Sequence, residues 1–243
     1  KALVAAHPNL DTFVCAAGIS PENTFHVGNF REVVTTYFVV RALQELGKKT
    51  RFIFSWDDFD RFRAVPKGVD PSFAKYSGMP YSAVPDPHGC CKSYAAHIEN
   101  EFETTLKAFG IPVEFLYQTQ QYQSGRYREG IHQALVSRHR IYDILKSFNS
   151  QAVSQVSANA FYPVNLYCEK CGKDHTSVSA YDEGARILYY SCPCSHQGAQ
   201  SVREATTIKL IWKVDWPMRW REEQVVFEPG GRNHSAAAGS YNV

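Results

Sequence analysis

Clustered cysteines are the residues of this sequence best suited to bind a metal ion. All of the seven cysteines except Cys15 fall into three close groups. Two of these groups supply four thiolates at the spacing typical of structural zinc sites, Cys168-Glu-Lys-Cys171 and Cys192-Pro-Cys194. His196 is the alternative to Cys194 as the fourth ligand. Such grouping indicates metal binding rather than disulfides, and it predicts a reducing compartment, the cytoplasm.

A second candidate zinc site combines different ligand types: Asp86, Cys90, Cys91 and His97. Cys90 and His97 are two helical turns apart, so they share a face if a helix starts near Cys90. The alternative is a pair of buried cysteines that cap a helix beside a surface histidine. Spacing alone slightly favours this alternative, because mixed ligand sets are less diagnostic than paired Cys-x2-Cys motifs.

The segment His26-Val27-Gly28-Asn29 is a candidate phosphate site. It follows a short apolar run and a loop, and it opens a strongly periodic helix. A glycine at this position lets backbone amides approach an anion, and the helix N-terminus adds unpaired N–H groups and a partial positive charge. The pattern therefore predicts that a nucleotide phosphate binds here.

Carboxylates and tryptophans form two further candidate groups. Three carboxylates, Asp57, Asp58 and Asp60, follow an apolar strand. They could bind a cationic substrate group or Mg²⁺, or else cap a helix or pair with nearby arginines. The second group lies beside a polar, glycine-rich loop, and we interpret it as a substrate pocket: Trp212, Asp215, Trp216, Trp220, Glu228 and His234.

Composition sets broad limits on the class of protein. The 243 residues are 44% hydrophobic and 21% charged, which is ordinary for a globular protein. A formal charge of +2 neither requires nor excludes a nucleic-acid partner. The longest apolar runs are too short to span a bilayer, and the start of the chain carries no signal-peptide pattern. We therefore expect one large domain or two smaller ones, with no membrane partner.

The first 150 residues alternate strand-like and helix-like segments. Strands are expected over 12–16, 51–55 and 113–117, and helices over 30–41, 94–109 and 127–148. Gly47 is placed as the stop of the first helix. This alternation predicts an α/β fold with a parallel sheet, in which ligands bind at the carboxyl ends of the strands. The His26 loop and the loop after Trp56 would then face one crevice.

The sequence changes character after Ser150. Residues 151–160 resemble a linker, and two strand-like arms, 161–167 and 186–191, each lead into a cysteine pair, as in a small zinc ribbon. From Ile208 to Val214 the chain is strand-like again, which we interpret as a return to the first sheet. The predicted organisation is a nucleotide-binding domain over 1–150, a zinc-ribbon-like insertion over 151–207, and a return to that domain over 208–243.

Five motifs in this order resemble those of a known family: His26-Val-Gly-Asn-Phe-Arg-Glu32, Phe54-Ser-Trp-Asp-Asp58, Asp86-Pro-His-Gly-Cys90, Asp215-Trp-Pro-Met-Arg-Trp220 and Phe227-Glu-Pro-Gly-Gly-Arg-Asn-His234. Together they resemble the class I lysyl-tRNA synthetases of the archaeal type. The resemblance covers essentially the whole chain, and the Asp-Trp-Pro-x-Arg-Trp block is specific to that family.

This resemblance implies a Rossmann-type catalytic domain of the HIGH superfamily, a parallel sheet flanked by helices, with an inserted zinc-bearing region. The implied reaction activates lysine with ATP and Mg²⁺ to lysyl-adenylate and transfers it to tRNA(Lys). His26, Gly28 and Asn29 match the HIGH motif, which stabilises charge at the phosphates. Gly18, Ser20, Trp212 and His234 match substrate-pocket positions. The Asp86–His97 group matches a zinc site, which reverses the preference drawn from spacing.

The sequence departs from the family pattern in two places. Pro21 is followed by Glu22-Asn23-Thr24 where the family usually has Ser-Gly. This change should weaken ATP binding unless Glu22 points away. A Lys-Met-Ser-Lys-Ser-like loop is also missing before the last residue, Val243. We therefore expect an incomplete catalytic fragment that activates lysine poorly.

Two other functions fit part of the sequence. A nucleotidyltransferase of the HIGH superfamily would keep His26 and Gly28 but has no need of the block from Trp212 to Trp220. A zinc-ribbon RNA-binding module would use basic residues near the expected long helix as its electrostatic footprint: Arg126, Arg128, Arg138, Arg140 and Lys146. A solvated helix face is the simpler account of those charges.

Overall fold

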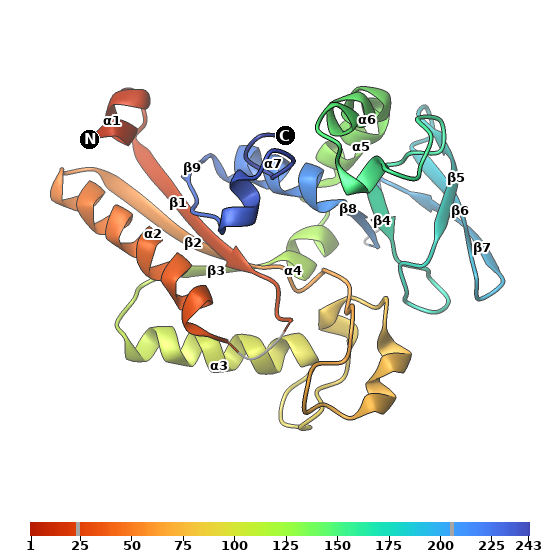
Figure 1. Cartoon of the computed structure of the whole chain (residues 1–243), viewed down its shortest axis with the longest axis horizontal. Coiled ribbons are helices and arrows are strands. Elements are labelled where there is room, and N and C mark those ends of the chain that lie inside the picture. The colour runs from red at the N-terminus through yellow and green to blue at the C-terminus, as the bar shows by residue number, and fades with distance from the viewer. Residues whose placement is uncertain (23–24, 205–206) are drawn as a thin grey trace.

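A parallel four-stranded sheet forms the centre of the computed structural model, which describes residues 1–22, 25–204 and 207–243. The strand order is β3-β2-β1-β9, with β1 at Thr12–Ile19, β2 at Lys49–Trp56, β3 at Glu114–Tyr117 and β9 at Val225–Phe227. Figure 1 shows helices on both sides of this sheet. The predicted α/β class and parallel sheet are confirmed.

Two helices cover one face of the sheet, α2 (Val27–Glu45) and α3 (Tyr94–Ala108). They bury large side chains that alternate along the strands, including Phe13, Phe54 and Phe102. Gly47 ends the first helix in the left-handed region, with φ of +72°, a conformation that glycine adopts at no steric cost. Both helices lie where the sequence periodicity places them.

The opposite face of the sheet carries smaller residues and is covered by α7 (Trp212–Glu223). Ala16, Ile53 and Leu116 form a small apolar cluster there. Gly18 and Ser55 follow on the same face, because side chains alternate along a strand. Space remains between these residues and α7, and the candidate site lies in that space.

A second part of the molecule contains a three-stranded antiparallel sheet in the order β5-β6-β7. Its strands are Ser177–Asp182, Ile187–Cys192 and His196–Ser201. A separate antiparallel pair, β4 (Val164–Leu166) and β8 (Ile208–Leu210), connects it to the first part. Helices α4 (Gln118–Gln123), α5 (Arg128–Val136) and α6 (Arg138–Ser147) lie beside these strands, and α5 shares a hydrophobic cluster with β6.

The remaining elements are short. Helix α1 spans Ala2–Ala6, and 3₁₀ turns occupy Pro71–Tyr76, Tyr81–Ala83, Gln151–Val153 and Arg232–Ser235. The segment between β2 and α3 has no other helix or strand, yet it packs its own cluster around Phe62, Tyr81 and Tyr94.

Two predictions about elements are wrong in detail. The expected helix over 127–148 is two helices, which separate at Ser137. The expected strand over 208–214 ends at Leu210 and pairs with β4 rather than with the first sheet, and the chain returns to that sheet only at β9.

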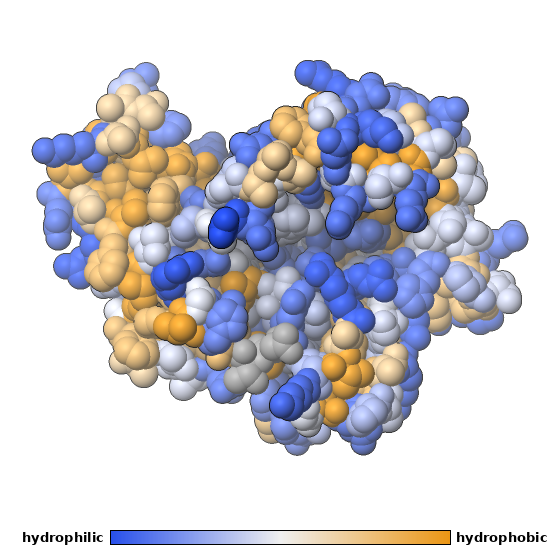
Figure 2. Space-filling model, in the orientation of Figure 1, coloured by the Kyte–Doolittle hydropathy of each residue, from blue (hydrophilic) through white to orange (hydrophobic). Residues whose placement is uncertain are grey.

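Hydrophobic and hydrophilic residues are unevenly distributed over the face of the molecule in Figure 2. Hydrophobic residues gather at the left, over α1, the start of β1 and α2, whereas white and blue residues dominate the recessed middle of this face. Among the described residues, none of the helices combines the length and the apolar character needed to cross a membrane.

Candidate functional site

The His26 motif caps the N-terminus of α2. The Nδ1 atom of His26 accepts a hydrogen bond from the N–H of Gly28 at 3.0 Å, and the His26 N–H donates to Oδ1 of Asn29 at 3.3 Å. A Cβ at Gly28 would lie 2.7 Å from the His26 ring, so the ring can take this position only because residue 28 is glycine. Because Nδ1 accepts, the neutral ring carries its proton on Nε2.

An outer cavity of about 420 Å³ opens beside this motif. Among its lining residues are eight that the sequence singled out as candidate site residues: Gly18, Ser20, His26, Asn29, Asp57, Asp60, Trp212 and His234. They come from the end of β1, the start of α2, the end of β2, and the C-terminal segment, so strand ends far apart in sequence meet at one place. The predicted single crevice therefore exists.

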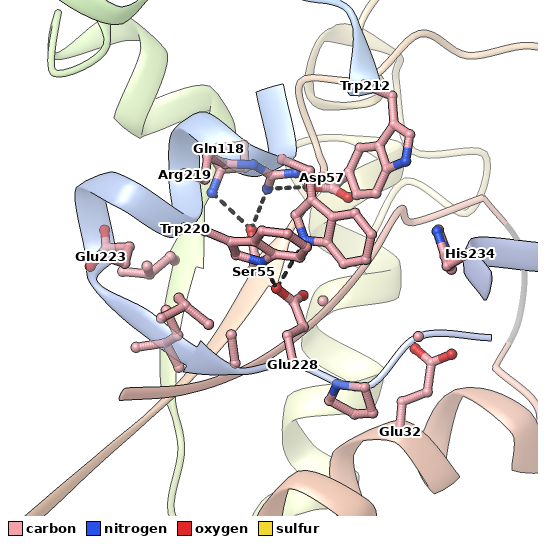
Figure 3. Close-up of a pocket in the computed structure, with 18 of the residues that line it drawn as sticks. Glu32, Ser55, Asp57, Gln118, Trp212, Arg219, Trp220, Glu223, Glu228 and His234 are labelled. Carbon is pink, nitrogen blue, oxygen red and sulfur yellow. Dashed lines mark hydrogen bonds and ion pairs between the residues drawn. The ribbon is translucent and has the colours of Figure 1, made fainter. Parts of the chain in front are cut away.

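An inner cavity of about 60 Å³ adjoins it between the sheet and α7. The two cavities share five lining residues: Gly18, Glu32, Asp57, Trp212 and His234. Trp212, Trp216 and Trp220 recur every fourth residue of α7, and neighbouring rings lie 4.8 and 4.6 Å apart. The rings of Trp212 and His234, which line both cavities, lie 6.2 Å apart, and Figure 3 shows the two side chains near each other at the right.

Glu228 lies against this row of tryptophans. Its Oε2 accepts hydrogen bonds from Nε1 of Trp216 at 2.9 Å and from Nε1 of Trp220 at 2.5 Å. Burial raises the pKa of the Glu228 carboxyl to about 7, although the two indole donors oppose this shift. Glu228 therefore orients two rings of the cavity wall and titrates near neutral pH.

A network of buried charges fixes the base of the site (Figure 3). Arg219 on α7 contacts Oδ1 of Asp57 at 2.6 Å and Oδ2 of Asp215 at 3.3 Å, and it donates to Oγ of Ser55 at 2.8 Å. Lys209 contacts Asp215 at 3.1 Å. Burial opposes the charge of Asp215, but Arg219 and Lys209 hold its pKa below the ordinary value. The network ties β2, β8 and α7 together.

Three of the predicted site residues do not line either cavity. Asp215 is fully buried in the charge network. Asp58 accepts a hydrogen bond from the N–H of Thr119 at 2.8 Å and lies beneath α4, while burial raises its pKa to about 6. Gly28 supports the ring of His26 without facing the cavity. Asp215 and Asp58 therefore hold parts of the fold together and do not face the cavities.

Sequence reasoning missed three of the residues that line the outer cavity: Phe25, Glu32 and Arg63. Glu32 had a signal, because it lies three residues after Asn29, which lines the cavity, and so shares that face of α2. Glu22 also lines the cavity, and its carboxylate lies 3.4 Å from Arg63. The expected effect of Glu22 is therefore moderated by a cationic partner, while Asn23 and Thr24 lie outside the described residues.

The four-cysteine group closes into one cluster. The Sγ atoms of Cys168, Cys171, Cys192 and Cys194 all lie within 4.8 Å of one another, so Cys194 and not His196 joins the group. His196 instead lies 3.9 Å from Glu169. Burial opposes ionisation of Cys168, but backbone N–H groups of Cys171 and Lys170 outweigh it and lower its pKa to about 6. The cluster of four cysteines can therefore hold a metal ion.

The second group also comes together: Asp86, Cys90, Cys91 and His97. The Sγ of Cys90 lies 3.2 Å from Nδ1 of His97, and Asp86 Oδ1 lies 3.4 Å from the same nitrogen. The reason differs from the expected one, because α3 starts at Tyr94 with Ser93 as its cap. Cys90 lies in the preceding loop, which folds back over the first turn of the helix.

Two of the five basic residues proposed as an RNA footprint are engaged within the protein. Arg126 contacts Glu223 at 2.6 Å. Arg138 donates to the carbonyl oxygens of Ala158, Asn159 and Phe161. Guanidinium groups held in this way add little to a binding surface, so the RNA-binding module loses part of its support.

Comparison with known proteins supports the same family as the motifs. The family model described as "tRNA synthetases class I (K)" matches residues 2–243. The lysine–tRNA ligase of Treponema pallidum is 41% identical over 99% of this chain and 46% of its own length. Those of Pyrococcus horikoshii and Thermococcus kodakarensis are 40% and 41% identical, over 96% of this chain and 44% of theirs. The chain thus spans less than half of these relatives, and it belongs to the class I tRNA synthetase (K) family.

Proposed function

We propose that this chain is the part of a lysine–tRNA ligase that binds ATP and lysine, forms lysyl-adenylate, and passes the lysyl group to tRNA(Lys). The observation that carries the proposal is the sequence identity of about 40% to lysine–tRNA ligases over nearly the whole chain. The cavity beside the His26 motif is the site at which this chemistry would occur.

The N-terminus of α2 would stabilise the negative charge that develops on the phosphates of ATP. His26 faces the outer cavity, and its protonated Nε2 can donate to a phosphate oxygen. The dipole of α2 acts at the same point. Catalysis is then electrostatic, and the chain forms no covalent intermediate. A Mg²⁺ ion accompanies ATP in this family of reactions.

Lysine would bind where the two cavities meet, among acidic and aromatic side chains. Glu32 and Asp57 line both cavities and suit a cationic substrate, because a buried ammonium group needs carboxylate partners. Trp212, His234 and Gly18 also line both cavities, and Gly18 places no side chain between β1 and Ser55 of the paired strand. Glu228 would act on lysine through the orientation of Trp216 and Trp220.

The two ligand clusters are proposed as zinc sites. Four thiolates about 2.3 Å from a tetrahedral Zn²⁺ lie about 3.8 Å apart. The Sγ atoms of Cys168 and Cys194, and those of Cys171 and Cys192, are each separated by 3.7 Å. A mixed set with Asp86 and His97 is also chemically suitable. Zinc would stabilise the fold at these positions, and two zinc ions per chain by elemental analysis is the expected result.

The three proposed parts of the chain have distinct tasks. Residues 1–150 and 208–243 would form the catalytic domain, and residues 151–207 a zinc-ribbon-like insertion held to it by the pair β4 and β8. The cytoplasm is the expected compartment, because free thiolates must stay reduced to bind zinc.

Lysine-dependent ATP–pyrophosphate exchange by the full protein tests the assignment. We expect exchange with lysine and a loss of about 10²-fold or more in His26→Ala, the usual cost of removing one such donor. His139→Ala, an exposed histidine on α6 outside both cavities, is the matched control and should keep wild-type exchange. Exchange that is absent in the wild type, or unaffected in His26→Ala, would contradict the proposal.

A further inference from the structure

Three consecutive residues after β2, Phe59 to Arg61, each contact a residue of the second part of the molecule, either in the insertion over 151–207 or in strand β8. The Tyr167 hydroxyl donates to the carbonyl oxygen of Phe59 at 2.7 Å. The Lys209 ammonium lies 2.9 Å from Oδ1 of Asp60. The guanidinium of Arg61 lies 3.5 Å from Oδ2 of Asp174. A loop of the first part is therefore clamped from the second part at three successive positions.

The clamping groups have little freedom to move. The side chains of Lys209 and Asp174 are each 3% exposed, and Tyr167 is buried as well. Lys209 also contacts Asp215, which fixes its ammonium group from the other side. Polar contacts that are shielded from water in this way hold a geometry more firmly than contacts at an exposed surface.

Asp174 is itself fixed by the cysteine loop from which it emerges. The N–H of Cys168 donates to the carbonyl oxygen of Lys173 at 2.9 Å, just before Asp174. The Asp174 N–H donates to the carbonyl oxygen of Gly78 at 2.8 Å. Gly78 has φ of +89°, and a Cβ there would lie 2.8 Å from Nε2 of His175. The two loops therefore pack at a close, defined distance.

The clamped loop reaches directly into the outer cavity. Asp60 lines that cavity, and its second oxygen, Oδ2, accepts a hydrogen bond from Oγ of Ser20 at 3.3 Å. Ser20 lines the cavity too and follows β1. The N–H of Asp57 donates to the carbonyl oxygen of Ile19 at 2.9 Å, which keeps the two strand ends in register. A shift of the loop would therefore move Asp60 and Ser20 together.

We propose that Tyr167, Asp174 and Lys209 are positioning residues for the substrate cavity. They hold the loop Phe59–Arg61 in place, and this loop in turn fixes Asp60 and Ser20 in the cavity wall. The inference rests on the proposed function, and it names lysine as the affected substrate because a carboxylate and a hydroxyl suit an ammonium group. None of the three residues lines the outer or the inner cavity, so their effect is indirect.

The test compares steady-state pyrophosphate exchange and lysine affinity in Tyr167→Phe, Asp174→Asn and Arg61→Met. Each variant should raise the KM for lysine about three- to tenfold and leave kcat within about twofold, and the change in Kd measured by tryptophan fluorescence should match. Arg61→Lys, which keeps the cation beside Asp174, should restore a KM close to that of the wild type.

Matched controls make the same chemical changes away from the clamp. Tyr142→Phe removes a hydroxyl that donates to the Val156 carbonyl at 3.0 Å, and Asp182→Asn alters a carboxylate that accepts from Ala185 in the ribbon hairpin. Both should keep the wild-type KM. An unchanged KM in the clamp variants would overturn the inference, as would an equal rise in the controls or a fall in kcat that tracks Tm. Absence of exchange in the wild type would instead refute the proposed function.

Discussion

The two faces of the central sheet are built from alternate residues of the same strands, yet they differ in almost every physical property. One face presents Phe13, Phe54 and Trp56 to helices α2 and α3 and is filled by apolar side chains. The other presents Gly18 and Ser55 to α7 across a space that holds charged groups and two cavities.

This difference separates stability from binding within one element. Because strand side chains alternate, a large residue on one face leaves its neighbour free to be small on the other. The apolar face supplies burial, and the charged face gives up close packing to leave room for a ligand. Substitutions on the two faces should therefore affect different measurements, and the following variants test that expectation.

Arg219→Met on the charged face should have the largest effect. The substitution keeps an unbranched apolar side chain but leaves the buried carboxylates of Asp57 and Asp215 without their shared guanidinium partner. Breaking a buried ion pair by removing one partner costs about 3–5 kcal/mol. Chemical denaturation should show this loss, and lysine-dependent exchange should fall because Asp57 lines the cavity.

Arg221→Met, two residues along α7, is the control for that experiment. Its side chain is 56% exposed, and its guanidinium contacts Glu222 and Gln133 at the surface. We expect a change within about 0.5 kcal/mol, the usual range for surface positions. Equal losses in the two variants would mean that the buried network contributes no more than surface pairs do.

Leu106→Ala on the apolar face should destabilise the protein without changing the site. Leu106 is fully buried between α3 and the sheet, and truncation of such a residue costs roughly 3 kcal/mol. The KM values for lysine and ATP, measured at a temperature where the variant is folded, should match the wild type. Leu46→Ala, which is 45% exposed, is the control for stability. A raised KM in Leu106→Ala would break the distinction between the two faces.

Gly18→Ala should have a smaller effect on stability and a clear effect on binding. A Cβ at Gly18 would lie 2.9 Å from the carbonyl oxygen of Ser55 on the paired strand, so β1 or β2 must shift. Overpacking of this kind costs about 1–3 kcal/mol. Since Gly18 lines both cavities, the KM for lysine should rise as well. In Gly184→Ala the new Cβ lies 3.6 Å from Asp182, an ordinary contact, and neither quantity should change.

The sequence predicts the apolar face well and the charged face poorly. Periodicity locates α2 and α3 because their buried stripes follow simple spacing, and Cys-x2-Cys spacing identifies the cysteine cluster. Helix α7 was missed since Pro217 lies inside it, and an internal proline usually breaks a helix at a cost of about 3 kcal/mol. Packing of its tryptophans and the contacts of Arg219 offset that cost, and both depend on partners far away in sequence.

The same limit applies to the carboxylates that follow β2. Asp57 and Asp58 are neighbours, and no sequence pattern shows that one faces the cavity while the other accepts from Thr119. Alternation along the chain separates them only once the sheet faces are known. The break at Ser137 was likewise invisible, because the apolar stripe continues through it without glycine or proline.

Glu99 on α3 is the exception on the apolar face, and it offers the finest test of the comparison. Its side chain is buried, and among the described residues its Oε1 has no hydrogen-bond partner. Burial raises the pKa of its carboxyl from 4.5 to about 8, and the nearby carboxylates Asp58 and Glu103 add to the shift while Lys92 opposes it. The folded protein therefore holds Glu99 protonated at neutral pH.

The sign of the pH effect follows from that shift. The unfolded chain releases the proton near pH 4.5 and the folded chain near pH 8, so the stability that Glu99 contributes is complete below pH 4.5 and is lost as pH rises to about 8. Glu99→Gln removes this titration. The variant should resemble the wild type at pH 5 and exceed its free energy of unfolding by about 1 kcal/mol or more at pH 8.5. Parallel stability profiles across this range would show that the apolar face tolerates a buried carboxylate, and the contrast between the two faces would then be one of shape rather than of charge.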